Sequence, residues 1–138
     1  MANSLLMLDL MRTYLWFDEQ LRSRLAERGW GAVSRSQSLV LTHIANGVSR
    51  ASRIAENLGV TRQAMSQLLS DMESRGLIEL QPDPFDRRAQ LVQFAPGGAA
   101  IREDAQQTLR ELERDMEEAL GSERMRDLRE ALERFPER

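Results

Sequence analysis

The chain has 138 residues, a formal net charge of −3 and 30% charged side chains, as expected for one folded, soluble domain rather than a disordered chain. It has no cysteine and only one histidine, which excludes disulfides and thiolate catalysis and argues against a transition-metal site. No apolar run is long enough to cross a bilayer and the first residues do not form a signal peptide, so we expect a cytoplasmic protein without membrane contact.

Arginine supplies all of the basic charge apart from the single histidine. Because acidic residues outnumber arginines, any contact with nucleic acid would have to come from a local arginine cluster. The sequence contains no glycine-rich phosphate loop, no paired histidines and no nucleophile motif. We therefore expect neither enzyme activity nor a bound cofactor.

The first predicted helix covers residues 4–28 and has a broad apolar face. Two rows of apolar side chains recur at helical spacing. They are Leu6, Leu10, Tyr14, Phe17, Leu21 and Leu25, widened by Met7, Met11 and Leu15. Two interpretations remain open: the helix lies in the core of its own chain, or part of its face meets another subunit. Gly29 and Gly31 are expected to end it.

A second helix is predicted to begin at Ser34 or Ser36 and to end near Asn46, where Asn-Gly marks a stop. The following stretch, residues 50–75, is predicted to form two short helices joined by a tight turn, with Ser49 as a cap of the first. Gly59 stands where the chain needs a left-handed residue to reverse direction. Thr61 is placed to cap the second helix. This is the helix-turn-helix pattern.

The second helix of this motif carries polar side chains on its outward face. Arginine favours guanine edges and glutamine favours adenine edges. The candidates for contact with base edges are Arg62, Gln63, Ser66 and Gln67, and the candidates for contact with phosphates are Ser49, Thr61 and Arg75. The alternative is a solvated helix face without a partner.

Two alternating stretches, residues 77–81 and 89–94, predict a pair of antiparallel strands after this helix. The prolines and aspartates of residues 82–88 predict a loop between them, and such a hairpin is the wing of a winged helix. Arg88 is the candidate for the minor groove and Arg87 for a phosphate. Asp86 is expected to hold a guanidinium or to shape the loop. The alternative for one arginine is an internal Asp–Arg pair that only stabilises the wing.

Residues 96–98 are predicted to break the chain, and two amphipathic helices follow on either side of Gly121. Their apolar stripes, like that of the first helix, exceed what a small core needs. We therefore expect a single domain over residues 1–138, in which residues 1–30 and 97–138 form dimerisation helices and residues 34–95 form a DNA-binding lobe. The expected fold class is mainly α, a winged helix-turn-helix with a small two- to three-stranded antiparallel β wing.

These motifs resemble the MarR family of bacterial winged helix-turn-helix regulators over essentially the whole chain. The matching segments are Ser36–Gln37 with Leu41, Ile54–Thr61, Met72–Ile78 and the wing loop Asp83–Arg88. The chain departs from the family after the wing, where Phe94-Ala95-Pro96-Gly97 replaces a Leu-Thr pair and a glycine. The resemblance implies an obligate homodimer with its recognition helices in successive major grooves. Such proteins are usually repressors that small aromatic or phenolic ligands release from DNA.

The resemblance also implies an effector pocket where the dimerisation helices meet the DNA-binding lobe. Side chains that could line it are Tyr14, Trp16, Trp30 and His43, with Arg12 or Arg22 as a partner for a ligand carboxylate. The alternative is that these aromatic residues are ordinary core.

The sequence thus predicts a sequence-specific regulator that binds double-stranded DNA, and the resemblance implies that it is a ligand-responsive homodimeric repressor of a pseudo-palindromic operator. The rival interpretation is a winged-helix module that binds another protein and has no specific DNA site. The acidic net charge fits the rival, whereas the arginine pair of the wing favours DNA.

Overall fold

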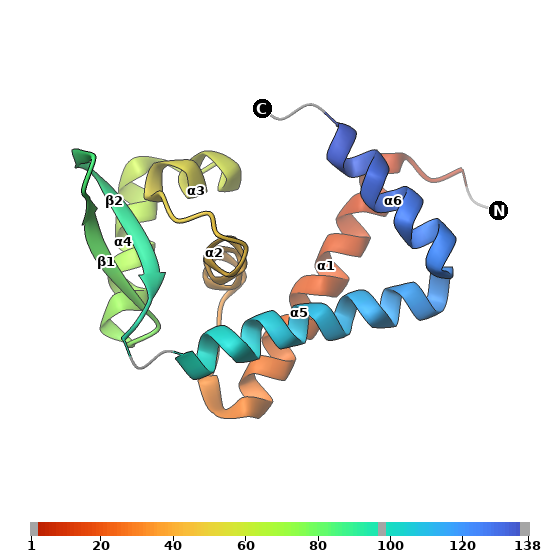
Figure 1. Ribbon diagram of the computed structural model, residues 1–138, viewed down its shortest axis with the longest axis horizontal. Helices are drawn as coiled ribbons and strands as arrows, with labels where there is room; N and C mark the ends of the chain where they lie inside the picture. The colour runs from red at the N-terminus through yellow and green to blue at the C-terminus, as the bar shows by residue number, and fades with distance from the viewer. Residues whose placement is uncertain (1–2, 97–98, 136–138) are drawn as a thin grey trace.

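The computed structural model describes residues 3–96 and 99–135 and is mainly helical (Figure 1). Its elements are α1 (Leu6–Leu25), the π-helical turn η1 (Ala26–Trp30), α2 (Arg35–Ala45), α3 (Ala51–Leu58), α4 (Arg62–Ser74), β1 (Ile78–Asp83), β2 (Asp86–Phe94), α5 (Ala99–Leu120) and α6 (Ser122–Arg134). The predicted fold class is confirmed, with a two-stranded antiparallel sheet. Of the predicted break, residues 97–98 lie outside the described residues. No helix within the described ranges is long and apolar enough to cross a membrane.

The elements fall into two groups (Figure 1). α2, α3, α4 and the two strands form a compact body, residues 34–95, which we call the winged lobe. The long helices α1, α5 and α6, which we call the terminal helices, extend away from it. α2 contacts α1 and α5 as well as α3, α4 and β2, so it joins the two groups.

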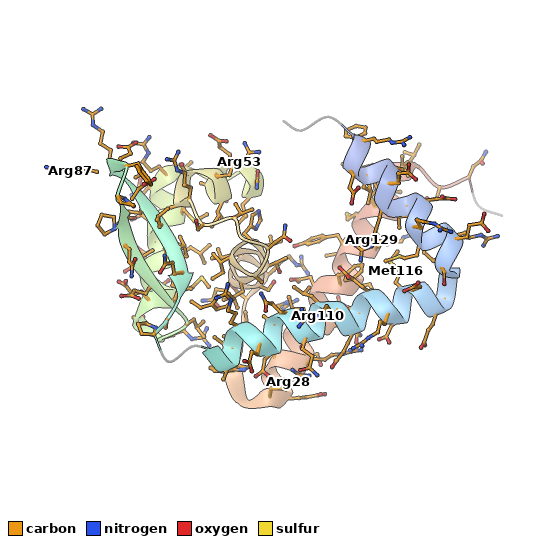
Figure 2. The ribbon with its side chains drawn as sticks, in the orientation of Figure 1. Arg28, Arg53, Arg87, Arg110, Met116 and Arg129 are labelled. Carbon is orange, nitrogen blue, oxygen red and sulfur yellow. The ribbon has the colours of Figure 1, made fainter. Side chains whose placement is uncertain are left out.

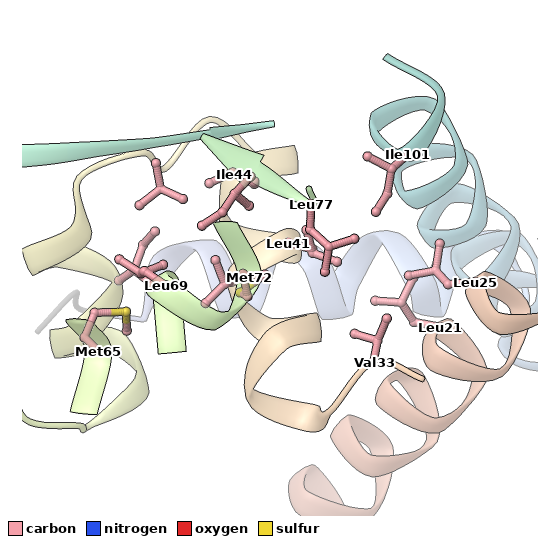
Figure 3. Packing of buried hydrophobic residues seen from close by; sticks show 14 of the residues in the cluster. Leu21, Leu25, Val33, Leu41, Ile44, Met65, Leu69, Met72, Leu77 and Ile101 are labelled. Carbon is pink, nitrogen blue, oxygen red and sulfur yellow. The ribbon is translucent and has the colours of Figure 1, made fainter. Parts of the chain in front are cut away.

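Apolar side chains from the elements of the winged lobe meet in one core (Figure 3). Met65, Leu69 and Met72 of α4 are buried because a spacing of four and then three residues places them on one helix face. Leu41 of α2 and Ile54 of α3 are fully buried beside them. This packing leaves the opposite face of α4 toward solvent.

The turn between α3 and α4 has the predicted geometry. Gly59 ends α3 in the left-handed region, with φ +70°, a conformation that costs most other residues free energy. The Thr61 hydroxyl accepts a hydrogen bond from the Ala64 N–H at 3.1 Å and so caps α4. The helix-turn-helix prediction is confirmed.

The starts of α2 and α3 differ in how they are capped. The Ser34 hydroxyl accepts from the Gln37 N–H and the Gln37 side chain accepts from the Ser34 N–H, which is a capping box. The prediction that Ser49 caps α3 is wrong, because the residue before the helix is Arg50 and no side chain caps it. The Ser49 carbonyl instead accepts from the Val92 N–H at 2.7 Å, which holds this residue as extended chain against β2.

A buried carboxylate links α1 to α2. Asp18 is only 4% exposed, and its oxygens accept from the Ser38 hydroxyl and from Nε of Arg22 and Arg35, the last two at 3.0 Å. Ser38 and Arg35 belong to α2, so the network fixes the first turn of α2 against α1. A carboxylate this deeply buried is tolerated because its oxygens accept these three hydrogen bonds, two of them from guanidinium groups that balance its charge.

The apolar face of α1 is divided along its length. Leu21 and Leu25 near its C-terminal end lie in the core, as one of the two interpretations predicted. The N-terminal half is left partly to largely exposed by the described residues. Its exposed large apolar side chains are Leu5, Leu6, Met7, Leu8, Leu10, Met11, Tyr14 and Trp16, and the end of the chain adds Leu132 and Phe135.

Candidate nucleic-acid interface

α4 presents to solvent the polar face that the sequence predicted. The core-facing residues hold the opposite side, so the outward side chains are exposed. They are Arg62, Gln63, Ser66 and Gln67. Among the described residues, one hydrogen bond involves this face, from the Gln67 amide to Asp71 Oδ1 at 3.2 Å. The remaining guanidinium, amide and hydroxyl groups are available to base edges.

A shallow hollow of about 420 Å³ lies at the N-terminal end of α3. Unpaired backbone N–H groups and the helix dipole make this end favourable for an anion. Glu56 also lines the hollow, and its Oε2 lies 3.8 Å from Nη1 of Arg53. The polar side chains that line the hollow are Ser49, Arg50, Ser52 and Arg53.

The sequence predicted only Ser49 of this group. The first helix of a helix-turn-helix crosses the DNA backbone, and this rule could have added Arg50, Ser52 and Arg53 as candidates for phosphate contact. In Figure 2, Arg53 of α3 and Arg87 of the wing lie at the same edge of the winged lobe. The hollow therefore extends the candidate interface beyond α4.

The wing is longer and tighter than predicted. β1 and β2 reach Asp83 and Asp86, so only Pro84 and Phe85 form the turn. The predicted strand limits were too short because prolines and aspartates normally indicate a loop. Pro82 stays in the ladder of a two-stranded sheet, where an edge strand tolerates the missing N–H.

The ladder between the strands contains a bulge. Pro82 pairs with Gln90 and the next residue, Asp83, pairs with Asp86. Three residues of β2, Arg87–Ala89, therefore have no partner opposite them. A β-bulge bends the strand and redirects its side chains, so the arginine pair leaves the regular ladder. The predicted position of Arg87 and Arg88 in a tip loop is wrong: both belong to β2.

Asp86 shapes the wing, and no guanidinium of the described residues binds it. Its Oδ1 accepts from the Arg88 N–H at 3.0 Å, which is one of the two roles predicted for it. Arg87 and Arg88 are exposed, and no ion pair within the described part of the chain engages either of them. Both side chains are therefore available to a phosphate or a groove (Figure 2 labels Arg87).

Among the described residues neither Arg87 nor Arg88 forms the internal Asp–Arg pair predicted as an alternative; the Asp–Arg pair of this region joins Asp83 to Arg50. Nε and Nη2 of Arg50 lie 3.2 and 2.9 Å from Asp83 Oδ2, and Asp83 Oδ1 accepts from the Phe85 N–H at 2.9 Å. The bond from the Phe85 N–H, with those from Arg50, lowers the pKa of Asp83 below its ordinary value. Asp83 thus ties the turn of the wing to the start of α3.

Arg75 is exposed, but its guanidinium is hydrogen-bonded within the chain, to α2 and η1. Its Nη1 donates to Gln37 Oε1 at 3.0 Å and its Nη2 to the Trp30 carbonyl at 3.5 Å. Arg75 also precedes β1, which has six residues. At about 3.3 Å per residue, this strand separates Arg75 from the wing turn by about 20 Å. We therefore omit Arg75 from the candidate interface.

Charge is unevenly divided along the chain. Residues 34–95 contain seven arginines and six acidic residues, whereas residues 96–138 contain eight arginines and twelve acidic residues. The acidic surplus thus lies outside the winged lobe. A low overall pI is compatible with a basic local surface.

The four side chains predicted to line an effector pocket are not brought together. Trp16 is exposed and packs edge-to-face on Phe17, and Trp30 Nε1 donates to Asp104 Oδ2 at 2.7 Å. Tyr14 lies on the exposed part of α1, where partial burial, followed by the charge of Asp18, raises its pKa. The predicted pocket of Tyr14, Trp16, Trp30 and His43 is therefore not a single site in this chain.

His43 instead lines an open cleft of about 470 Å³ between α2, the end of α3 and α5. Its Nδ1 lies 2.6 Å from the Leu39 carbonyl, and because a carbonyl only accepts, Nδ1 donates this hydrogen bond. Arg110 of α5 lines the same cleft, whereas Arg22, predicted as a carboxylate partner, bonds to Asp18. In the described ranges no three acidic or histidine side chains are grouped to hold a metal ion.

Comparison with known proteins identifies relatives of this fold. The sequence profile described as MarR family matches residues 33–89. Wild-type MarR from E. coli in the apo form has a TM-score of 0.67 and 23% identity, over 96% of this chain and 97% of that chain. A point mutant of MarR from E. coli complexed with operator DNA has a TM-score of 0.66 and 25% identity, over 90% and 88%. NadR in complex with 4-hydroxyphenylacetate has a TM-score of 0.74 and 19% identity, over 96% and 93%. No curated protein sequence matches the chain.

Proposed function

Since the chain belongs to the MarR family of winged-helix transcriptional regulators, which bind DNA and are not enzymes, we propose that it is a homodimeric repressor of a pseudo-palindromic operator. A small aromatic acid releases it from DNA, and it acts in the cytoplasm. The observation that carries the proposal is the outward face of α4 beside two wing arginines that are exposed and have no ion-pair partner among the described residues.

Each part of the interface has its own role in the proposal. α4 enters the major groove, where Arg62 reads guanine and Gln63 reads adenine. Arg88 enters the adjacent minor groove, whose narrow A·T-rich segments attract guanidinium groups, and Arg87 contacts a phosphate. The α3 hollow receives a second phosphate through Arg50 and the backbone N–H groups of α3.

The dimer follows from the uncovered apolar surface of the terminal helices. Leu6 is 72% exposed, Met7 80% and Phe135 74%, and covering such side chains contributes about 1.5–3 kcal/mol each. A second copy would bury them and place two winged lobes on successive major grooves, one helical turn apart. Residues 1–30 and 97–138 thus serve dimerisation and residues 34–95 serve DNA binding.

The rival function is a module that binds a protein through the winged lobe. The acidic net charge favoured that rival, but the acidic surplus lies in residues 96–138. Dependence on salt separates the two functions. Binding to DNA weakens steeply as salt rises because counterions are released, whereas an apolar protein interface is much less sensitive.

Selection of duplexes from a random pool at physiological salt tests the proposal. We expect the purified protein to enrich an inverted repeat with half-sites about 10 base pairs apart. Raising the salt concentration should reduce the affinity of the protein for the selected duplex. If the protein is a folded dimer and the selected pool stays random, both with and without aromatic acids, specific DNA binding would be refuted.

Repeating the selection with Gln63→Ala tests the assignment of α4. We expect one position in each half-site to lose its base preference, at a cost of about 1–3 kcal/mol per contact. Gln107→Ala is the matched control, because Gln107 is an exposed amide on α5 outside the winged lobe. An equal loss on selected and random duplexes would mean that Gln63 touches only the backbone.

The cleft lined by His43 and Arg110 is the proposed effector site. It lies between the winged lobe and α5, so a bound molecule changes the angle between them. Arg110 suits a carboxylate and His43 Nε2 suits a phenolic hydroxyl. That NadR is seen with 4-hydroxyphenylacetate supports this ligand class.

We expect 4-hydroxyphenylacetate or a related hydroxylated aromatic acid to weaken binding to the selected duplex and to change tryptophan fluorescence. Arg110→Ala should raise the ligand concentration needed by about tenfold, the value of one charge-assisted hydrogen bond. Arg114→Ala, an exposed arginine one turn along α5, is the control. If no aromatic acid changes either signal, the effector part of the proposal fails.

A further inference from the structure

The wing turn carries an exposed aromatic ring. Phe85 is 94% exposed, more than any other large apolar side chain among the described residues. A single exposed apolar side chain needs no explanation in most places. Phe85, however, occupies the outermost turn of the wing, two residues from Arg87 and three from Arg88.

The turn that presents this ring is held in place from both sides. Asp83 is 4% exposed and uses one oxygen for the Phe85 N–H and the other for Arg50. Asp86 holds the Arg88 N–H on the far side of the turn, and Pro84 has a restricted φ. A ring on a fixed turn loses less conformational entropy on binding than one on a mobile loop.

We infer that Phe85 inserts into the minor groove of the operator as an apolar wedge and partly unstacks one base step in each half-site. This inference rests on the proposed DNA binding and adds a residue that reads DNA through its deformability. The neighbouring arginines bring the wing to a groove of negative potential. Aromatic and aliphatic side chains that insert between base steps in such a groove are removed from water, and they kink the duplex.

A wedge gives sequence preference without hydrogen bonds to bases. Pyrimidine–purine steps such as TA and CA/TG open at the lowest cost. We therefore expect selected duplexes to carry such a step beneath the wing, flanking the bases read by α4. The bound duplex should also be bent toward the major groove, as wedges in the minor groove cause.

The test compares wild type with Phe85→Ala and Phe85→Leu on a duplex selected by the wild-type protein. The duplex carries 2-aminopurine in place of adenine at the step beneath the wing or, as a control, midway between the half-sites. Fluorophores at the duplex ends report bending. Phe85 has almost no contact with the core, so both variants fold, and circular dichroism checks this.

We expect wild type to raise 2-aminopurine emission at the wing step only, and Phe85→Ala to lose that signal and bind about tenfold or more weakly. Phe85→Leu, which keeps an apolar wedge, should retain most of both properties. Equal affinity, emission and bending for wild type and Phe85→Ala would overturn the wedge.

Weaker binding by Phe85→Ala, with no emission change in wild type, would also overturn the wedge, because the ring would then only pack against the backbone. Failure of wild type to bind any duplex would overturn the proposed function and the wedge together. If wild type binds the selected duplex and Phe85→Ala binds it equally well, the wedge alone would be overturned and the proposed function would stand.

Discussion

Arg88→Ala is expected to abolish tight operator binding while the dimer stays folded. Arg88 is exposed in the bulge of β2, and among the described residues no carboxylate binds its guanidinium. Removing a base-reading side chain costs about 1–3 kcal/mol, and a symmetric dimer makes the contact twice. The expected loss is therefore about 2–6 kcal/mol, or at least about thirtyfold in affinity.

Titration of the selected duplex at one fixed salt concentration measures this loss. Arg114→Ala removes an exposed arginine from α5 and serves as the control for charge alone. Arg87→Ala should behave differently from Arg88→Ala, weakening all duplexes about equally and reducing the salt dependence. Wild-type affinity for Arg88→Ala would exclude the minor-groove role of Arg88.

Leu10→Glu is expected to convert the dimer into a folded monomer and to remove most of the operator affinity. Leu10 is 48% exposed in the single chain, so its replacement leaves the core of the monomer intact. In the proposed dimer the new carboxylate would be buried in an apolar interface, which costs several kcal/mol in each copy. A lone winged lobe keeps only about half of the binding free energy, so for a dimer of nanomolar affinity the loss is about 6 kcal/mol, or at least about four orders of magnitude in affinity.

Analytical ultracentrifugation gives the oligomeric state and duplex titration gives the affinity. Ser23→Glu adds the same charge to an exposed position of the same helix and should change neither. A Leu10→Glu protein that remains dimeric would show that the N-terminal half of α1 is not the dimer interface. A monomer with full operator affinity would show that dimerisation is not needed for binding.

The helix-turn-helix could be predicted from the sequence because its signals are local. Gly59 and Thr61 act on residues within one turn of themselves, and the spacing of Met65, Leu69 and Met72 alone defines the buried side of α4. The polar residues between them must then face outward. The outward α4 residues therefore follow directly from the pattern.

The wing shows where local signals fail. Alternation predicted both strands, but their ends depend on the register between Pro82 and Gln90 and on the bulge beyond it. Composition predicted a long loop because proline and aspartate are rare in strands. Pairing across the hairpin overrode that preference and placed Arg87 and Arg88 in β2.

The contacts that the sequence did not reveal join residues far apart in the chain. Asp83 meets Arg50 across 33 positions and Asp18 meets Ser38 across 20. Arg110 reaches the cleft of His43 from a helix that begins more than 50 residues later. A carboxylate or guanidinium gives the same sequence signal whether it is solvated or paired, so only the packing of the elements identifies its partner.

The sequence by itself determined the helices, the turn chemistry of residues 59–61, the outward face of α4 and the presence of a wing. These features depend on backbone preferences and apolar periodicity within a few residues. Tertiary structure alone decided that Asp83 fixes the wing turn to α3, that the Arg75 guanidinium is hydrogen-bonded to Gln37 and Trp30, and that Phe85 is exposed at the wing turn. Those outcomes depend on which distant groups satisfy each other's hydrogen bonds once water is excluded, and that is a property of the packed molecule.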